Sequence, residues 1–142
     1  MKLQIEKIAQ LKSLRVEKSE LSEKERELTK PILTDISLIK PLYEAFCAVL
    51  SERDCPPCID SVIQRKKFLF IIMYLYSPST LAGGKMGKGL RSELAKVVGV
   101  NAQSVISRDC RDIVFLYKHY KTFAFDIEDI FPKIMEMVRV DV

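Results

Sequence analysis

A chain of 142 residues, 48% of them hydrophobic, is long enough for one domain with a core of its own, and this excludes wholesale disorder. The scarcity of chain-breaking residues, with 6 prolines and 5 glycines, favours helices over many short strands. The net charge is +4, and residues 65–121 hold 11 Lys and Arg against 3 Asp and Glu. Such a concentration of positive charge is typical of a polyanion-binding surface, the alternative being a basic face without a partner.

The amino terminus and the apolar runs predict no leader and no membrane span. Residues 1–6 lead directly into a charged stretch, which does not fit a secretory signal. The longest apolar run, residues 68–76, has nine residues, whereas a membrane span needs about 20. Four cysteines in such a chain indicate free thiols in a reducing compartment. We therefore expect a cytoplasmic protein without membrane contacts.

Residues 1–30 predict a charged helical arm. They are rich in Lys and Glu and contain neither Gly nor Pro, so residues that favour helices dominate. Leu3, Ile8, Leu11 and Leu14 form an incomplete apolar stripe, which would need a partner to bury it. Pro31 is expected to end this helix. The arm is therefore a candidate for oligomerisation, and residues 31–142 form the expected helical domain.

The expected helices of residues 31–142 follow from apolar residues at helical spacing. The segment FLFIIMYLY, residues 68–76, is apolar on every side, which is typical of a central buried helix. A strand is the competing interpretation for so short a run, but no strand-like segment nearby could pair with it. Asp126 is expected to cap the last helix. The predicted fold class is all-α, a small helical bundle with helices at about 37–53, 60–76, 90–98, 101–121 and 126–139.

One segment, residues 90–117, carries a pattern of small, flexible and apolar residues at fixed spacing. Ala95 is small enough to let two helices approach, and Gly99 can adopt the left-handed conformation that ends the first of them. Val100 would fill the angle between the helices, and Ile106 would point inward. The segment LRSELAKVVGVNAQSVISRDCRDIVFLY thus resembles the helix-turn-helix DNA-binding motif. Ile106 follows Gly99 by seven residues where the common pattern has six, which indicates a turn lengthened by one residue.

The resemblance implies a non-enzymatic protein that binds double-stranded DNA. It would act as a transcriptional regulator or as the DNA-recognition component of a phage or mobile element, usually as a homo-oligomer on paired half-sites. The outward side chains of the second helix would read base edges, and these are Gln103, Ser104, Ser107, Arg108 and Arg111. Basic residues around the motif would contact phosphates, and these are Arg65, Lys66, Lys67, Lys85, Lys88, Arg91, Lys118 and Lys121.

The glycine-rich stretch GGKMGKG, residues 83–89, could suggest a nucleotide-binding loop. It does not match the phosphate-loop pattern GxxxxGK[ST], because Gly83 and Gly87 are too close and Gly89 replaces the hydroxyl residue that would hold magnesium. We expect a mobile basic hinge that places Lys85 and Lys88 beside DNA phosphates. A plain flexible connector is the alternative.

Metal, redox and catalytic chemistry find little support in the sequence. Cys55 and Cys58 have the spacing of half a zinc knuckle or of a redox dithiol, but no second cysteine pair completes a zinc site. Packing at a helix start is the alternative role for these cysteines, and no metal or cofactor is expected. With a single histidine, no nucleophile–base pair suggests itself. The alternative function is a helical protein-interaction scaffold, or an assembly protein resembling a small terminase subunit.

Overall fold

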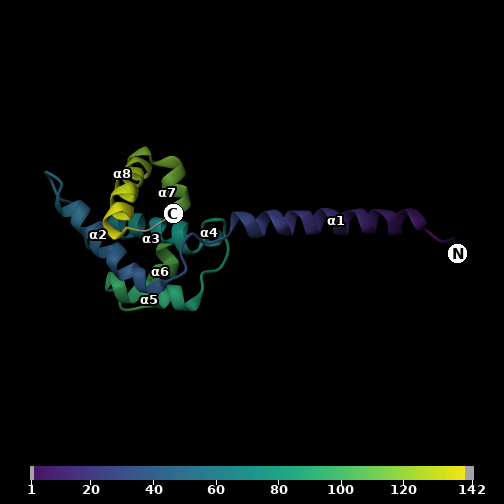
Figure 1. Cartoon of the computed structure of the whole chain (residues 1–142), viewed down its shortest axis with the longest axis horizontal. Helices are drawn as coiled ribbons and strands as arrows, with labels where there is room; N and C mark the ends of the chain where they lie inside the picture. Colours follow the sequence, from purple (N-terminus) through teal and green to yellow (C-terminus); the bar gives the residue numbers. More distant parts are fainter. Residues whose placement is uncertain (1, 140–142) are drawn as a thin grey trace. The chain divides into compact units, whose positions relative to one another are not determined.

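The computed structural model describes residues 2–139, and these residues form helices and no strand. The chain divides into two compact units, residues 1–30 and 31–142. Figure 1 shows the helices of each unit. The predicted all-α class is therefore confirmed, and so is the assignment of the apolar run at residues 68–76 to a helix.

The first unit consists of one helix, α1 (Ile5–Leu28). Its sequence favours a helix throughout, and the chain leaves the helix at Thr29, just before Pro31. None of the residues of α1 is buried. Its large apolar side chains, among them Leu11, Leu14 and Leu21, are more than half exposed. α1 therefore buries no apolar face of its own.

The second unit is a bundle in which α3 is the central helix. It packs against α2, α4, α6, α7 and α8, while α2 also packs along α8 and against α5. The elements of this unit are η1 (Ile36–Leu38), α2 (Ile39–Ser51), α3 (Val62–Tyr76), α4 (Pro78–Leu81), α5 (Lys88–Val98), α6 (Gln103–Asp109), α7 (Ile113–His119) and α8 (Lys121–Val138).

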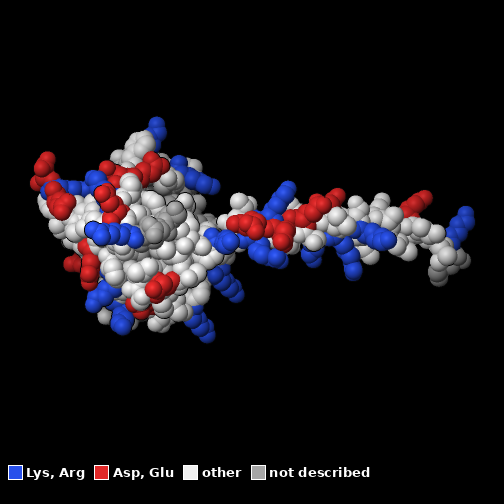
Figure 2. Space-filling view, in the orientation of Figure 1, with Lys and Arg blue, Asp and Glu red and all other residues white. Residues whose placement is uncertain are grey.

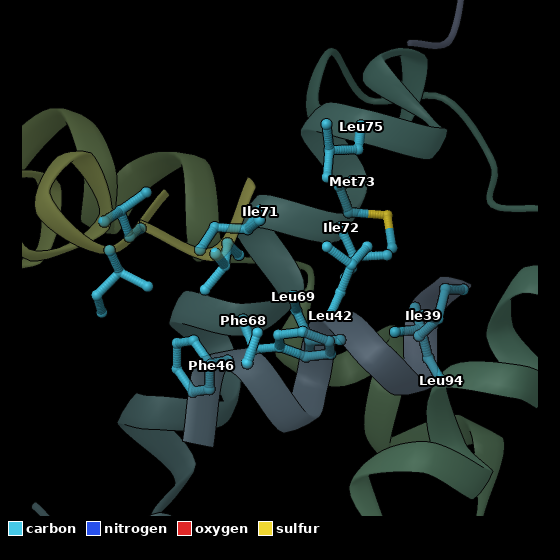
Figure 3. Close-up of a cluster of buried hydrophobic side chains, with 14 of the residues drawn as sticks. Ile39, Leu42, Phe46, Phe68, Leu69, Ile71, Ile72, Met73, Leu75 and Leu94 are labelled. Atoms are coloured by element: carbon cyan, nitrogen blue, oxygen red, sulfur yellow. The ribbon is translucent and has the colours of Figure 1, made fainter. Parts of the chain in front are cut away.

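The core gathers around the apolar second half of α3. Phe68 and Leu69 are fully buried there, and the ring of Phe68 lies 5.4 Å from that of Phe46 on α2. Figure 3 shows this aromatic contact, and it shows Ile39 of α2 close to Leu94 of α5. Burying one such side chain contributes about 1.5–3 kcal/mol to the free energy of folding. The core thus links α5, the first helix of the motif segment, to the centre of the bundle.

The structure corrects two expected helices near the carboxyl end. The single helix expected at 101–121 is two helices, because α6 ends at Asp109 and α7 begins at Ile113. The break lies where Asp109 and Asp112 both form ion pairs with the basic start of α3. Asp126 does not cap the last helix, since α8 begins at Lys121 and Asp126 lies inside it. Its carboxylate pairs instead with Arg53 and Lys67.

Candidate nucleic-acid interface

The turn between α5 and α6 is built around Gly99. This residue has φ 76° and ψ 31°, a left-handed conformation that glycine adopts without steric cost. The N–H groups of Gly99 and Val100 both donate to the carbonyl oxygen of Ala95, at 3.1 and 3.0 Å. Ala102 is extended, and α6 begins at Gln103. The local sequence thus produces two short helices joined by a tight turn.

The inner face of this pair of helices packs on the bundle. Leu94 and Ala95 of α5 are buried, and Ile106 of α6 is fully buried. Val105 is only half-buried, so the side chain that faces the core from α6 is Ile106. Val100 is half-buried and contacts the core cluster beside the turn. This arrangement fixes which side of α6 faces outward.

The outward side of α6 carries most of the residues expected to read bases. Gln103, Ser104 and Arg108 are exposed, and so is Arg111 just beyond the helix. Ser107 differs, because it is half-buried and its Oγ accepts a hydrogen bond of 3.1 Å from Arg91 Nη1. This bond joins α5 to α6 and restrains the orientation of α6 relative to α5.

Arg65, Lys66 and Lys67 take part in ion pairs inside the bundle. Arg65 Nε donates to Asp109 Oδ2 at 2.5 Å, and the two side chains are 15% and 2% exposed. Lys66 Nζ lies 2.8 Å from Asp112 Oδ2. Lys67 Nζ lies 2.6 Å from Asp126 Oδ2 on α8. These ion pairs hold α3 to α6, α7 and α8, and we therefore expect the three cations to contribute less to phosphate binding than the exposed basic residues.

Four of the remaining basic residues converge on one open groove. Lys85, Lys88, Arg91 and Arg111 line it, and its volume is about 660 Å³. The groove runs between the glycine-rich loop and the helices α5 and α6, and its other lining residues are Thr80, Leu81, Gly83, Gly84, Met86, Ser107, Cys110 and Val114. Burial raises the pKa of the Cys110 thiol to about 12, so this thiol adds no negative charge to the groove at physiological pH. The structure thus gathers a cluster of positive charge beside the outward face of α6.

Lys118 and Lys121 lie apart from this groove. Both are exposed, at the end of α7 and the start of α8. In Figure 2, Lys and Arg side chains project around the lower edge of the second unit, the region where Figure 1 places α5 and α6. The sequence predicts base contacts for Arg111 and phosphate contacts for Lys85 and Lys88. It does not predict that these three side chains line one groove, with Arg111 in the turn between α6 and α7.

The two cysteines of the CPPC segment do not pack at a helix start. Cys55 and Cys58 are both exposed, and the N-cap of α3 is instead Ser61, whose Oγ accepts a hydrogen bond from the N–H of Gln64 at 3.4 Å. Within residues 2–139, no group of three His, Cys, Asp or Glu side chains could hold a metal ion.

Two further findings bear on the chain as a whole. No helix in the described part of the chain is both long and apolar enough to cross a membrane. No family model matches the chain, and neither a curated protein nor a solved structure does.

Proposed function

We propose that the chain is a non-enzymatic, cytoplasmic protein that binds double-stranded DNA through α6. One observation carries the proposal: α5 and α6 are joined by a left-handed Gly99, with Ile106 buried and the polar face of α6 exposed. An α-helix with its side chains is about 10–12 Å in diameter, and the major groove, about 12 Å wide, admits it. In helix-turn-helix proteins the amino-terminal residues of the second helix contact the bases, and in α6 these are Gln103 and Ser104.

The exposed residues of α6 offer suitable chemistry for base recognition. The guanidinium of Arg108, whose side chain is 64% exposed, can donate two hydrogen bonds to guanine. The amide of Gln103 can pair in the same way with adenine. Transcriptional regulation or DNA recognition in a phage or mobile element is the role that we propose. The exposed apolar side chains of α1 are the feature that supports a homo-oligomer.

Selection of bound sequences from a random duplex pool at moderate salt tests the proposal. We expect one enriched motif, and its half-site spacing would also report the oligomeric state. Arg108→Ala should lower affinity for the selected duplex about tenfold and relax the choice of one base, since a bidentate contact contributes about 1–3 kcal/mol of discrimination. Lys133→Ala is the control, because Lys133 is an exposed cation on α8. Enrichment of no duplex would contradict the proposal, provided that circular dichroism shows an intact fold.

A protein-interaction scaffold is the second candidate function, and α1 favours it. No residue of α1 is buried, and its large apolar side chains, such as Leu21 and Leu28 at 64% and 81% exposed, are available to a partner. A scaffold would self-associate in sedimentation experiments and would retain no duplex from the pool. The proposed DNA-binding protein would retain duplex whether or not it self-associates.

A further inference from the structure

The groove between the glycine-rich loop and α6 has a charge that one DNA phosphate does not match. Lys85, Lys88, Arg91 and Arg111 bring four positive charges to it, and no Asp or Glu of the described chain is among its lining residues. A phosphodiester of DNA carries one negative charge, whereas a diphosphate or triphosphate group carries about three or four. The number of converging cations therefore favours a ligand with several linked phosphates.

Arg91 is incompletely hydrogen-bonded in this groove. Its Nη1 donates to Ser107, but its Nε is buried and has no hydrogen-bond partner among the described residues. A buried donor without an acceptor costs about 1–3 kcal/mol, and more when the group is charged. Arg91 is one of the residues that line the groove, so an anion bound there is a candidate acceptor for this N–H.

The start of α5 borders the same groove, because its first residue, Lys88, is a lining residue. Gly87 occupies the N-cap position and supplies no side-chain cap, so the first N–H groups of α5 lack that partner. An added Cβ at Gly87 or Gly89 would meet nothing within 4 Å, so packing within the protein does not require glycine there. The bare backbone lets a phosphate approach the positive end of the helix, beside the side chain of Lys88.

We propose that this groove binds the oligophosphate group of a small phosphorylated compound. The lysines and Arg111 neutralise its charge, and the Nε of Arg91 and the first amides of α5 donate to its oxygens. The proposal covers binding without hydrolysis, because Gly89 stands where a nucleotide-hydrolysing loop has its magnesium-binding hydroxyl. One part of this inference rests on the proposed DNA-binding function. The bound compound alters the DNA affinity of α6, because Arg91 also donates a hydrogen bond to Ser107 on that helix.

Titration of the full chain with inorganic tripolyphosphate tests the site. Nuclear magnetic resonance should show saturable shifts of the amide signals of residues 83–89 and of the Arg91 Nε–H signal. Calorimetry should give one site, with an affinity at least fivefold lower in Lys88→Gln and unchanged in Lys96→Gln. The two variants remove the same charge from exposed positions of α5, but only Lys88 lines the groove. Shifts that do not saturate, or equal losses in both variants, would show diffuse counterion attraction and overturn the proposal.

A parallel set of binding measurements with duplex DNA distinguishes a free compound from the DNA backbone as the source of the phosphate. Tripolyphosphate binding in the absence of any duplex binding would support the site while the proposed DNA function fails. Tripolyphosphate that binds the groove and changes duplex affinity in the wild type, but not in Lys88→Gln, would support both. Duplex affinity that falls only in Lys88→Gln, without tripolyphosphate binding, would mean that the groove serves backbone phosphates alone, and the proposal would be wrong.

Discussion

Asp109 is a buried acid at the contact between α6 and α3. Its side chain is 2% exposed, and its Oδ2 accepts from Arg65 Nε at 2.5 Å. Asp109→Asn removes the negative charge and leaves Arg65 without its counterion in a largely buried position. We expect the free energy of unfolding to fall by about 3 kcal/mol, as when one partner of a buried ion pair is lost. Urea denaturation followed by circular dichroism measures this change.

Asp112 provides the matched control three residues later. Its carboxylate pairs with Lys66 at 2.8 Å, but its side chain is 46% exposed. Solvent weakens such a pair, so Asp112→Asn should cost less than about 1 kcal/mol. Equal losses in the two variants would contradict the assignment of Asp109 as the carboxylate that holds α6 on the bundle.

Asp126 makes the stability of the second unit depend on pH. Burial by itself raises the pKa of this carboxyl, but the hydrogen bonds and charges of Arg53 and Lys67 outweigh burial and hold the pKa below 3.8. The unfolded chain then binds more protons than the folded one in this range, so the contribution is present above about pH 4 and is lost as pH falls through the lowered pKa. We expect the difference in unfolding free energy between the wild type and Asp126→Asn to shrink from pH 6 to pH 3. A difference that is constant over this range, in denaturation curves at each pH, would contradict the assignment.

Two glycines, Gly89 inside α5 and Gly99 at its end, should respond in opposite ways to the same substitution. Gly99 has φ 76°, so Gly99→Ala forces alanine into a left-handed conformation and should cost about 1–2 kcal/mol. Gly89 lies inside α5, and Gly89→Ala should stabilise the helix by about 0.5–1 kcal/mol. Neither added Cβ meets an atom within 4 Å, so the backbone conformation alone decides the sign. Thermal unfolding measures both changes, and a loss of stability in Gly89→Ala would contradict this account.

The helices could be predicted from the sequence wherever local signals decide them. The apolar run of α3 and the glycine at the end of α5 are such signals, and the structure has both elements there. The break between α6 and α7 could not be predicted, because it coincides with carboxylates that pair with residues more than 40 positions away. The expected start of the last helix, at residue 126, lies five residues after the observed start of α8 at Lys121, and the reason is related. Asp126 was assigned as a cap from its local position, although its partners lie on another part of the chain.

For the candidate site too, the contacts between distant residues could not be predicted from the sequence. The sequence located the basic segment, but it did not separate cations that pair inside the bundle from cations that face solvent. Lys66 and Lys118 have the same charge and lie in the same basic segment, yet Lys66 is 19% exposed and paired, whereas Lys118 is exposed. Only the packing of α3 against α6 and α7 distinguishes them.

This division of the positive charge predicts how duplex binding depends on salt for the whole molecule. Each lysine that contacts a phosphate releases counterions and contributes about −0.9 to the slope of log K against log salt concentration. Lys118→Gln should therefore flatten the slope by about 1, whereas Lys66→Gln should leave it unchanged, although both variants lower the net charge equally. Fluorescence anisotropy with a labelled duplex at several salt concentrations measures the slopes. Equal flattening in both variants would mean that net charge alone governs binding, and a wild-type affinity independent of salt would contradict phosphate contacts altogether.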